Sequence, residues 1–413
     1  MKRRVVVTGL GIVSPLGCQL DEVWQRIIAG ESGIHLMQLL DTADFKVRIG
    51  GDVLDWNPVG YLNPKDMKRV ERFTQFALVA GIDAIRNSQI DFEKIDRNRT
   101  GVILGSGIGG LGEVERQMIR MVERGPDQVS PMTVPRMMVN SAAANLAIEY
   151  QLHGSNYTVS TACASATNAI GEAFHAVRCG TMDTVITGGT EAAICRMSLS
   201  AFQNIKALSR RNDDPEKASR PFDTGRDGFV FGEGAGLLVL ESLEHAQQRS
   251  APILAEILGY GSSCDAVHIV QPDESGNGPS LAMKRALEDG GLQADDVDYI
   301  NAHGTSTPLG DIAETLAIKK VYGAHAPSLS ISSTKSQVGH SLGASGGVEL
   351  VVTIKALLEG VVPPTINLEN PDPQCDLDYT PIEAKSRVLR AAMSNSFGFG
   401  GHNASVIVGR FEP

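Results

Sequence analysis

The chain has little of three features that would each indicate a class of protein. Its six cysteines are scattered, with no Cys-x-x-Cys pair and no cysteine-histidine group at zinc-ligand spacing, so neither a disulfide framework nor a structural metal is predicted. A formal net charge of −11 argues against a nucleic-acid-binding surface, because phosphate contacts need clustered cations. No apolar run approaches the length of about 18 residues that a membrane helix needs. We therefore expect a cytoplasmic enzyme with no membrane or nucleic-acid partner.

What the chain does have is an alternation of buried strands and helices. Apolar runs end in glycine at Val102-Ile-Leu-Gly, Thr184-Val-Ile-Thr-Gly-Gly and Tyr299-Ile-Asn-Ala-His-Gly. Helical patterns occupy residues 280–289 and 346–358, so the fold class is α/β. The length of 413 residues allows two domains or one duplicated unit. We expect an N-terminal half, residues 1–252, and a C-terminal half, residues 253–413, although the sequence shows no repeat.

Cys163 is the most informative residue, and it lies in Tyr157-Thr-Val-Ser-Thr-Ala-Cys-Ala-Ser-Ala. The spacing of Ala166, Ile170 and Val177 predicts a helix that begins near Cys163, where unpaired N–H groups would favour a thiolate. The thiolate is the nucleophilic form of cysteine. The alternative is a packing residue, because cysteine is among the most buried residue types.

Two histidines lie in predicted turns, where chemistry is easier to arrange than packing. His303 lies in Asn301-Ala-His-Gly-Thr-Ser-Thr-Pro, directly after a predicted strand, and strand ends are where sites gather in α/β proteins. His340 lies in Lys335-Ser-Gln-Val-Gly-His-Ser-Leu-Gly, before a long predicted helix. A single histidine is usually structural, but with Cys163 these two would supply one thiol and two imidazoles.

Two further motifs indicate other chemistries. Gly105-Ser-Gly-Ile-Gly-Gly matches the dinucleotide fingerprint, but no strand ending in an acidic residue follows about 20 residues later to bind a ribose. Gly339-His-Ser-Leu-Gly matches the nucleophile elbow of serine hydrolases, and Asp372 and His402 follow in the required order. The polar residues 332–338 do not form the strand that an elbow needs. A serine acyl hydrolase or transferase that uses Ser341 therefore stays the less favoured alternative.

Seven motifs, in order along the whole chain, resemble those of the elongating β-ketoacyl-acyl-carrier-protein synthases, the condensing acyltransferases of type II fatty-acid synthesis. They are Val5-Val-Val-Thr-Gly-Leu-Gly, Gly105-Ser-Gly-Ile-Gly-Gly, Thr161-Ala-Cys-Ala-Ser, Arg226-Asp-Gly-Phe-Val, Asn301-Ala-His-Gly-Thr-Ser-Thr-Pro-Leu-Gly-Asp, Thr334-Lys-Ser-Gln-Val-Gly-His and Asn395-Ser-Phe-Gly-Phe-Gly-Gly-His-Asn. The resemblance implies a thiolase-like fold of two similar βαβαβαβ halves in five αβαβα layers, a homodimer, and no cofactor. The resemblance also implies that the glycine motifs are turns that line an acyl tunnel and do not bind phosphate.

The resemblance also implies catalytic roles. Cys163 would take an acyl group from acyl carrier protein, and His303 and His340 would hydrogen-bond the thioester oxygen of malonyl-acyl-carrier protein as it loses CO₂. The enolate would attack the acyl group, with the backbone N–H groups of Cys163 and Phe399 as the oxyanion hole, and release β-ketoacyl-acyl-carrier protein. A polyketide or secondary-lipid ketosynthase would carry the same residues, so the pathway stays open.

Other matching positions would support the site or bind substrate. Thr305 and Thr307 would bind the pantetheine arm, and Phe399 with Phe202 would gate an acyl pocket near Ile108.

A charged pair, Lys335 and Glu349, would orient the histidines, with an ordinary salt bridge as the alternative. No catalytic metal is implied, but relatives hold a structural monovalent cation at the region that corresponds to Asn301, Glu349 and Asn395.

A local basic surface is expected to bind the acidic carrier protein. Lys65, Lys68, Arg69 and Arg72 recur at helical spacing, which would place four cations along one face of a helix. Lys206 would be a further contact near the mouth of the acyl tunnel. The alternative is a solvated helix face balanced by neighbouring acidic residues.

Overall fold

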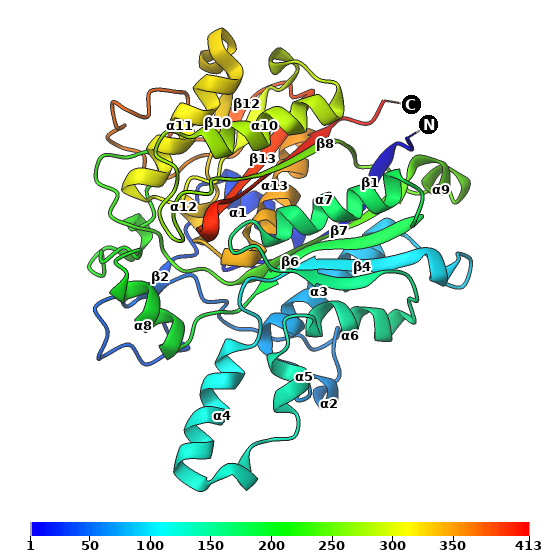
Figure 1. Ribbon diagram of the computed structural model, residues 1–413, viewed down its shortest axis with the longest axis vertical. Coiled ribbons are helices and arrows are strands. Elements are labelled where there is room, and N and C mark those ends of the chain that lie inside the picture. Colours follow the sequence, from blue (N-terminus) through cyan, green and yellow to red (C-terminus); the bar gives the residue numbers. More distant parts are fainter. Residues whose placement is uncertain (1, 413) are drawn as a thin grey trace.

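A mixed sheet of ten strands organises the computed structural model, which describes residues 2–412 (Figure 1). The first half of the chain contributes β1 (Val5–Val13), β4 (Thr100–Gly105), β5 (Asn156–Val159), β6 (Thr184–Glu191) and β7 (Gly234–Ser242). The second half contributes β8 (Ala255–Cys264), β9 (Tyr299–Asn301), β10 (Ser330–Ser332), β13 (Ala391–Gly398) and β14 (His402–Gly409). The strands lie in the order β10-β9-β13-β14-β8-β1-β7-β6-β4-β5.

The order of the strands reveals a duplication. The strands of each half are numbered here by their order along the chain. From the edge of the sheet to its centre, both halves then have the order third, second, fourth, fifth, first, and corresponding pairs of strands are parallel or antiparallel in the same way. The halves meet where β1 pairs with β8, from Val5 opposite Ile257 to Val7 opposite Ala255. The predicted boundary between residues 252 and 253 falls in the connection from α9 (Leu243–Gln248) to β8.

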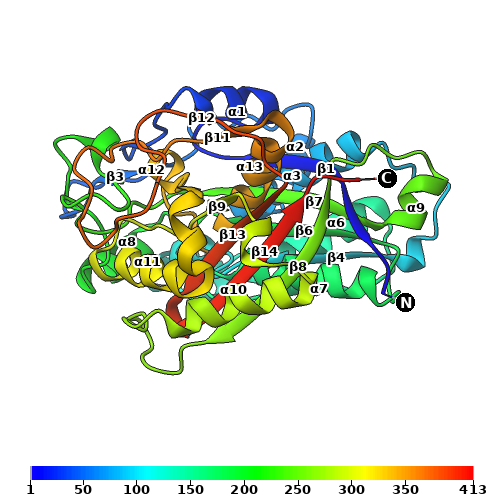
Figure 2. The ribbon, with the colours of Figure 1, turned by 90° about the horizontal axis from the view of Figure 1, so that it is seen from above.

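Helices complete five layers (Figure 2). The outer helices α3 (Arg72–Ser88) and α6 (Ser141–Tyr150) cover the first half of the sheet, and α10 (Asn277–Gly290) and α11 (Pro308–Tyr322) cover the second. Between the two halves lie α7 (Ser165–Arg178) and α13 (Ser345–Glu359). The middle position explains why α13 is buried from its first residue to Leu357. The expected thiolase-like layering is confirmed.

The remaining elements form the periphery. The other helices are α1 (Leu20–Ile28), α2 (Pro64–Met67), α4 (Leu111–Arg124), α5 (Thr133–Met137), α8 (Arg196–Asn204) and α12 (Lys335–Val338). Two small sheets pair β2 (His35–Leu36) with β3 (Ile49–Gly50) and β11 (Val361–Val362) with β12 (Lys385–Ser386). Helices α4 and α5 project from the body at the lower edge of Figure 1. Among the described helices, none combines the length and apolar character needed to cross a membrane.

The prediction of one continuous basic helix over residues 65–72 is wrong. Helix α2 ends at Met67, a turn follows, and α3 begins at Arg72. The backbone of Glu71 is extended, with φ −77° and ψ 162°, and its carboxylate accepts the N–H of Arg72. Glu71 therefore caps α3, and the charge spacing on which the prediction rested could not reveal this cap.

Arg72 does not belong to the exposed basic surface. Its guanidinium donates to the buried carboxylate of Glu233, with Nε 3.0 Å from Oε1, and to the carbonyl of Val53 at 2.6 Å. These bonds fix the start of α3 to Val53 and to Glu233, the residue directly before β7, so Arg72 is a structural residue.

Glu241 on β7 illustrates how buried charge is satisfied at the edge of the core. Its carboxylate accepts from Arg249 Nε at 2.8 Å, His245 Nδ1 at 2.6 Å and Thr8 Oγ1 at 2.5 Å. Burial alone would raise the pKa of Glu241, but these hydrogen bonds outweigh it and lower the pKa to about 2. The carboxylate therefore stabilises the folded chain while it is ionised.

We predict that Glu241→Gln lowers the free energy of unfolding at neutral pH by about 3 kcal/mol, the energy equivalent of this pKa shift. A carboxyl whose pKa falls on folding stabilises the protein above its unfolded pKa, here 4.5, and the effect is lost as pH falls through about 2. Urea unfolding at several pH values measures the difference in the free energy of unfolding between the wild type and Glu241→Gln, and this difference should decrease below pH 4.5. Glu244→Gln, at an exposed position on α9, is the control. A difference in the free energy of unfolding that did not depend on pH would contradict the lowered pKa of Glu241.

Candidate active site

Cys163 lies in a tight turn between β5 and α7. Helix α7 begins at Ser165, two residues later, so the predicted helix start is confirmed. The Ser165 hydroxyl closes the turn by donating to the carbonyl of Ala162 at 2.6 Å and accepting the N–H of Thr161 at 2.9 Å. Ala162 has a φ of +50°, a left-handed conformation that costs a non-glycine residue about 1–2 kcal/mol. The turn holds this strained residue directly before the thiol.

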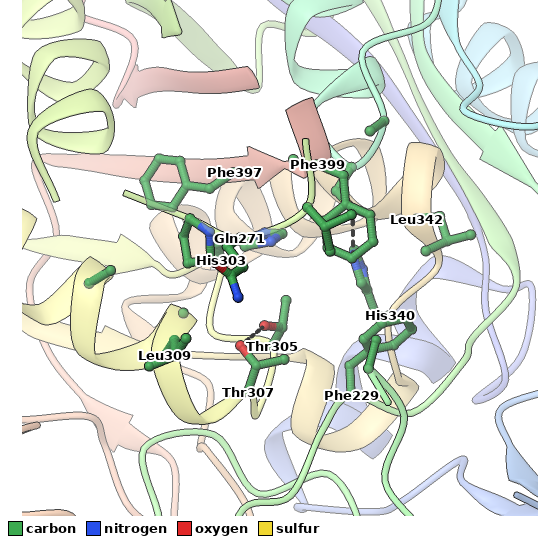
Figure 3. A pocket seen from close by; sticks show the side chains of 18 of the residues that line it. Phe229, Gln271, His303, Thr305, Thr307, Leu309, His340, Leu342, Phe397 and Phe399 are labelled. Atoms are coloured by element: carbon green, nitrogen blue, oxygen red, sulfur yellow. Dashed lines mark hydrogen bonds between the residues drawn. The ribbon is translucent and has the colours of Figure 1, made fainter. Parts of the chain in front are cut away.

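The fold brings the two histidines to this thiol. His340 Nε2 lies 3.0 Å from Cys163 Sγ, and its other ring nitrogen lies 2.8 Å from Ser345 Oγ. The ring of His303 is 5.4 Å from that of His340, centre to centre, at an interplanar angle of 84°. Figure 3 shows both imidazoles beside one cavity, with Phe399 close by. The three residues come from three separate segments of the chain.

Burial sets the protonation of these groups. Burial and the nearby ammonium of Lys335 hold the pKa of His303 and of His340 well below the usual histidine value, so both rings are neutral at neutral pH. Burial also raises the pKa of Cys163 to about 11, although the backbone N–H of Phe399 and the charge of Lys335 act in the opposite direction. The expected thiolate is therefore wrong for the resting site, because loss of water outweighs the Phe399 N–H and the charge of Lys335.

Lys335 and Glu349 form an ion pair that is 2 % exposed on either side. Lys335 begins α12 and Glu349 lies on α13, so the pair joins the segments on both sides of His340. Its burial distinguishes it from a surface salt bridge, because each charge would be costly without the other.

The end of β13 packs against the backbone of Cys163. A Cβ atom on Gly398 would lie 2.9 Å from the Thr161 carbonyl oxygen and 3.0 Å from the Cys163 nitrogen, so only glycine allows this approach. The contact places the N–H of Phe399 at the Cys163 sulfur. Two backbone donors, those of Cys163 and Phe399, are thus available beside the reactive atom.

A cavity of about 530 Å³ opens onto the thiol. The substrate-binding residues expected from the sequence all line it: Ile108, Phe202, Thr305, Thr307 and Phe399. Lys206, expected as a contact of the carrier protein, also lines it. The rings of Phe202 and Phe399 are stacked with centres 6.1 Å apart. The hydroxyls of Thr305 and Thr307 are 3.1 Å apart at the cavity wall (Figure 3). The cavity is thus apolar near the phenylalanines and polar at the threonines.

Two buried carboxylates shape the site, and sequence analysis missed both. Glu314 on α11 accepts the N–H of His303 at 2.9 Å and that of Gly304 at 2.8 Å. It lies on a helix between Ala313 and Ala317, which are buried, and an acidic residue on an apolar helix face was the available signal.

Glu191 at the end of β6 is the second missed carboxylate. It accepts the N–H of Gly107 at 2.7 Å, of Gly109 at 3.1 Å and of Gly343 at 3.2 Å. The glycine loop after β4 therefore binds a carboxylate of its own chain where a dinucleotide fingerprint would bind phosphate. Ile108 of that loop becomes part of the cavity wall.

The serine-hydrolase triad is not assembled. Ser341 Oγ lies 3.3 Å from Ser345 Oγ, and the residues before it form α12 and not a strand. Asp372 pairs with Arg226 at 2.8 Å, and His402 lines a different cavity. Ser341 has neither of the partners that an elbow serine needs.

The residues of the expected cation region lie together. Asn301 Nδ2 is 3.2 Å from the Glu349 carbonyl oxygen. Asn301 Oδ1 and Glu349 Oε2 are buried and have no hydrogen-bond partner among the residues that the structure describes. Asn395 Oδ1 accepts from Ser405 Oγ at 2.8 Å and is thus already partnered. Two free buried oxygens fit a monovalent cation.

The cations at residues 65, 68 and 69 are exposed beside the turn that follows α2. Arg136 of α5 donates to the carbonyls of Lys68 and Arg69 and so fixes this turn. Lys206 is exposed at the cavity, in the segment after α8.

Comparison with protein families gives two adjoining matches. Residues 2–246 match the Beta-ketoacyl synthase, N-terminal domain, and residues 254–369 match the Beta-ketoacyl synthase, C-terminal domain. The chain is 47 % identical over 411 residues to a 3-oxoacyl-[acyl-carrier-protein] synthase 2 of Synechocystis, covering 100 % of this chain and 99 % of that protein. It is 45 % identical over 409 residues to the protein of the same name from Coxiella burnetii, covering 99 % of each.

Solved structures agree with these matches. A β-ketoacyl synthase from Burkholderia phymatum superimposes with a TM-score of 0.92 at 36 % identity and full coverage of both chains. A type II polyketide ketosynthase, solved in complex with its acyl-carrier protein, has a TM-score of 0.92 at 34 % identity, again over 100 % of each chain.

We predict that Lys335→Met destabilises the protein by about 3–5 kcal/mol, because Glu349 is left as an uncompensated buried charge. Burial raises the pKa of Glu349, so in the variant this carboxylate can take up a proton. The loss of stability relative to the wild type should therefore be smaller at low pH. The double variant Lys335→Met/Glu349→Leu removes both charges and should recover most of the stability. Thermal unfolding across pH measures this, and a double variant as unstable as the single one would contradict the pairing.

Proposed function

The chain belongs to the β-ketoacyl synthase family, and from this membership we propose that it is an elongating 3-oxoacyl-acyl-carrier-protein synthase of fatty-acid synthesis. It would condense an acyl group held on Cys163 with malonyl-acyl-carrier protein, with loss of CO₂, to give β-ketoacyl-acyl-carrier protein. The observation that carries the proposal is the assembly of Cys163, His303 and His340 at one cavity. The activity would belong in the cytoplasm.

The first step is transfer of the acyl group to Cys163. His340 Nε2, 3.0 Å from Sγ, accepts the thiol proton as the sulfur attacks the thioester carbonyl. This assistance is required because the thiol is protonated at neutral pH. The N–H groups of Cys163 and Phe399 stabilise the oxyanion, and the pantetheine sulfur leaves with the proton.

The second step makes the new carbon–carbon bond. The neutral imidazoles of His303 and His340 donate N–H groups to the thioester oxygen of the malonyl group, where negative charge develops as the C–CO₂ bond breaks. In this step His340 carries its proton on Nε2 and Nδ1 accepts from the Ser345 hydroxyl, whereas in the first step the proton is on Nδ1 and Nε2 is the acceptor. The enolate carbon then attacks the acyl-Cys163 carbonyl, and the same oxyanion site is used again. Sγ leaves, the β-ketoacyl product is released, and the thiolate regains a proton from solvent.

The cavity supports a carrier-bound acyl substrate. Thr305 and Thr307 offer hydroxyls to a pantetheine arm, and Phe202, Phe399 and Ile108 supply an apolar surface for the acyl chain. The structural relatives include a type II polyketide ketosynthase at 34 % identity, whereas 45–47 % identity to 3-oxoacyl-acyl-carrier-protein synthases favours fatty-acid elongation.

A homodimer is part of this proposal. Strand β5 ends the sheet, so one edge of its backbone is available to a second copy of the chain. Tyr157 on this strand is 41 % exposed, and large apolar side chains of the neighbouring α4–α6 region are also exposed, among them Val122, Val134 and Ile148. An edge strand flanked by apolar surface suits pairing with the same element of a second copy.

A monovalent cation is a further element of the proposal. Asn301 Oδ1 and Glu349 Oε2 would hold it, and its charge would neutralise a carboxylate oxygen that Lys335 does not reach. Its contribution would be structural, because it would fix Glu349 and through that residue the position of Lys335.

We predict that the acyl group attaches to Cys163 alone and that His303→Ala separates the two steps. The variant should still be acylated, because His303 is not the ring in contact with the thiol, whereas decarboxylation of malonyl-acyl-carrier protein should fall by about 10²–10³. Intact mass and peptide mapping measure acylation, and CO₂ release measures the second step. Acyl label on Ser341, or full activity of His303→Ala, would overturn the assignment.

We predict that the acidic carrier protein docks on Lys65, Lys68, Arg69 and Lys206. Reversing Lys65 and Lys68 to Glu should raise the apparent KM for carrier-bound substrate about 10-fold or more and weaken the salt dependence of the rate. Lys94→Glu, an exposed charge reversal after α3, is the matched control. Small pantetheine thioesters should react at unchanged rates, and an equal loss with both substrates would place the defect elsewhere.

A further inference from the structure

The catalytic side chains also form a potential metal-binding cluster. The ligand atoms of Cys163, His303 and His340 all lie within 4.8 Å of one another. Among the described residues, this is the one group of three histidine, cysteine or acidic side chains that is so close. Sequence spacing predicted no such site, because the three come from the turn before α7, the loop after β9 and the loop after α12.

The chemistry of the donors is that of a zinc site. Zn²⁺ is bound by cysteine sulfur at about 2.3 Å and histidine nitrogen at about 2.0–2.1 Å, in a tetrahedron that an open site completes with solvent. Ligands of such a tetrahedron lie about 3.3–3.6 Å apart, close to the 3.0 Å between Cys163 Sγ and His340 Nε2. The fourth position would face the cavity, from which an ion can enter.

Two further observations support a bound ion. His303 Nδ1 is buried and has no hydrogen-bond partner in the part of the chain that the structure describes, so this ring has a nitrogen whose bonding capacity is unused. His340 has the opposite arrangement, because Ser345 Oγ lies 2.8 Å from the nitrogen that faces away from the thiol. A second partner on a histidine is the usual support of a metal ligand.

We propose that Cys163, His303 and His340 bind one Zn²⁺ ion in the free enzyme and that this ion blocks the reaction. On binding, the S–H bond of Cys163 breaks, a Zn–S bond forms and the proton passes to solvent, with no change of oxidation state. Lys335 opposes the ion by its charge, but Glu349 neutralises that charge. Metal binding does not depend on the function proposed above; only the effect of acylation does.

Acylation and metal binding exclude each other. In an acyl-enzyme the Cys163 sulfur belongs to a thioester, which is no longer an anionic ligand, and two histidines remain. The ion therefore binds only to enzyme in which the Cys163 thiol is not acylated. Alkylation of Cys163 by iodoacetamide has the same effect on the sulfur and needs no carrier protein.

The experiment is calorimetric titration of the full-length protein with ZnCl₂. We expect one tight site per chain, release of a proton, and an affinity at least about 100-fold lower in Cys163→Ser. Ser345→Ala should weaken binding about 10- to 100-fold, whereas Ser341→Ala, its neighbour without a contact to the ring, should not. Substitution with Co²⁺ should give a thiolate-to-metal absorption band that is absent from Cys163→Ser.

The exposed thiols Cys179 and Cys264 provide the specificity control, because both could bind the ion on the surface. Their double replacement by Ser should leave the tight site intact. Tight binding that persists in Cys163→Ser, or no tight binding to the free chain, would overturn the proposal. If acyl transfer to Cys163 failed, the proposed function would fall, while titration of iodoacetamide-treated protein would still decide the metal site.

Discussion

Exclusion of water from the seam between the two halves is the constraint on which the site depends. A charge without water has to be paired, and Lys335 with Glu349, and Glu314 and Glu191 with backbone N–H groups, meet that requirement. The same loss of water keeps the imidazole of His340 neutral and the thiol protonated. The residues that stabilise the seam are therefore also those that prepare it for chemistry.

Equivalent positions in the two halves of the duplicated architecture carry different catalytic residues. Each half places its third strand before a helix of the middle layer: β5 leads to α7, and β10 leads, through α12, to α13. Cys163 lies before α7 and His340 lies before α13, so equivalent places in the two halves supply the nucleophile and the group that accepts its proton. The site is a product of the repeat and not an addition to it.

Local patterns predicted the α/β class and the three central residues, because Cys163, His303 and His340 each stand at a turn that strand and helix patterns define. The duplication was expected from the family resemblance alone and not from a repeat in the sequence, since it is a repeat of strand order and not of residues. Glu191 escaped notice because its partners are backbone groups of Gly107 and Gly343, more than 80 residues away on either side. Charge spacing over residues 65–72 misled because it could not reveal the turn after Met67 and the Glu71 cap, and the helix terminus at Cys163 misled because the burial of the thiol was not considered.

The distance between the thiol and its histidine along the chain has a consequence for synthesis of the protein. Cys163 and His340 are separated by 177 positions, and the Phe399 N–H comes from the connection between the last two strands of the sheet. A nascent chain therefore carries the cysteine long before any residue that can activate it. His340 and the Phe399 N–H reach the sulfur only in the folded chain, so an unfinished polypeptide has neither the proton acceptor nor the oxyanion donor that acyl transfer to Cys163 uses.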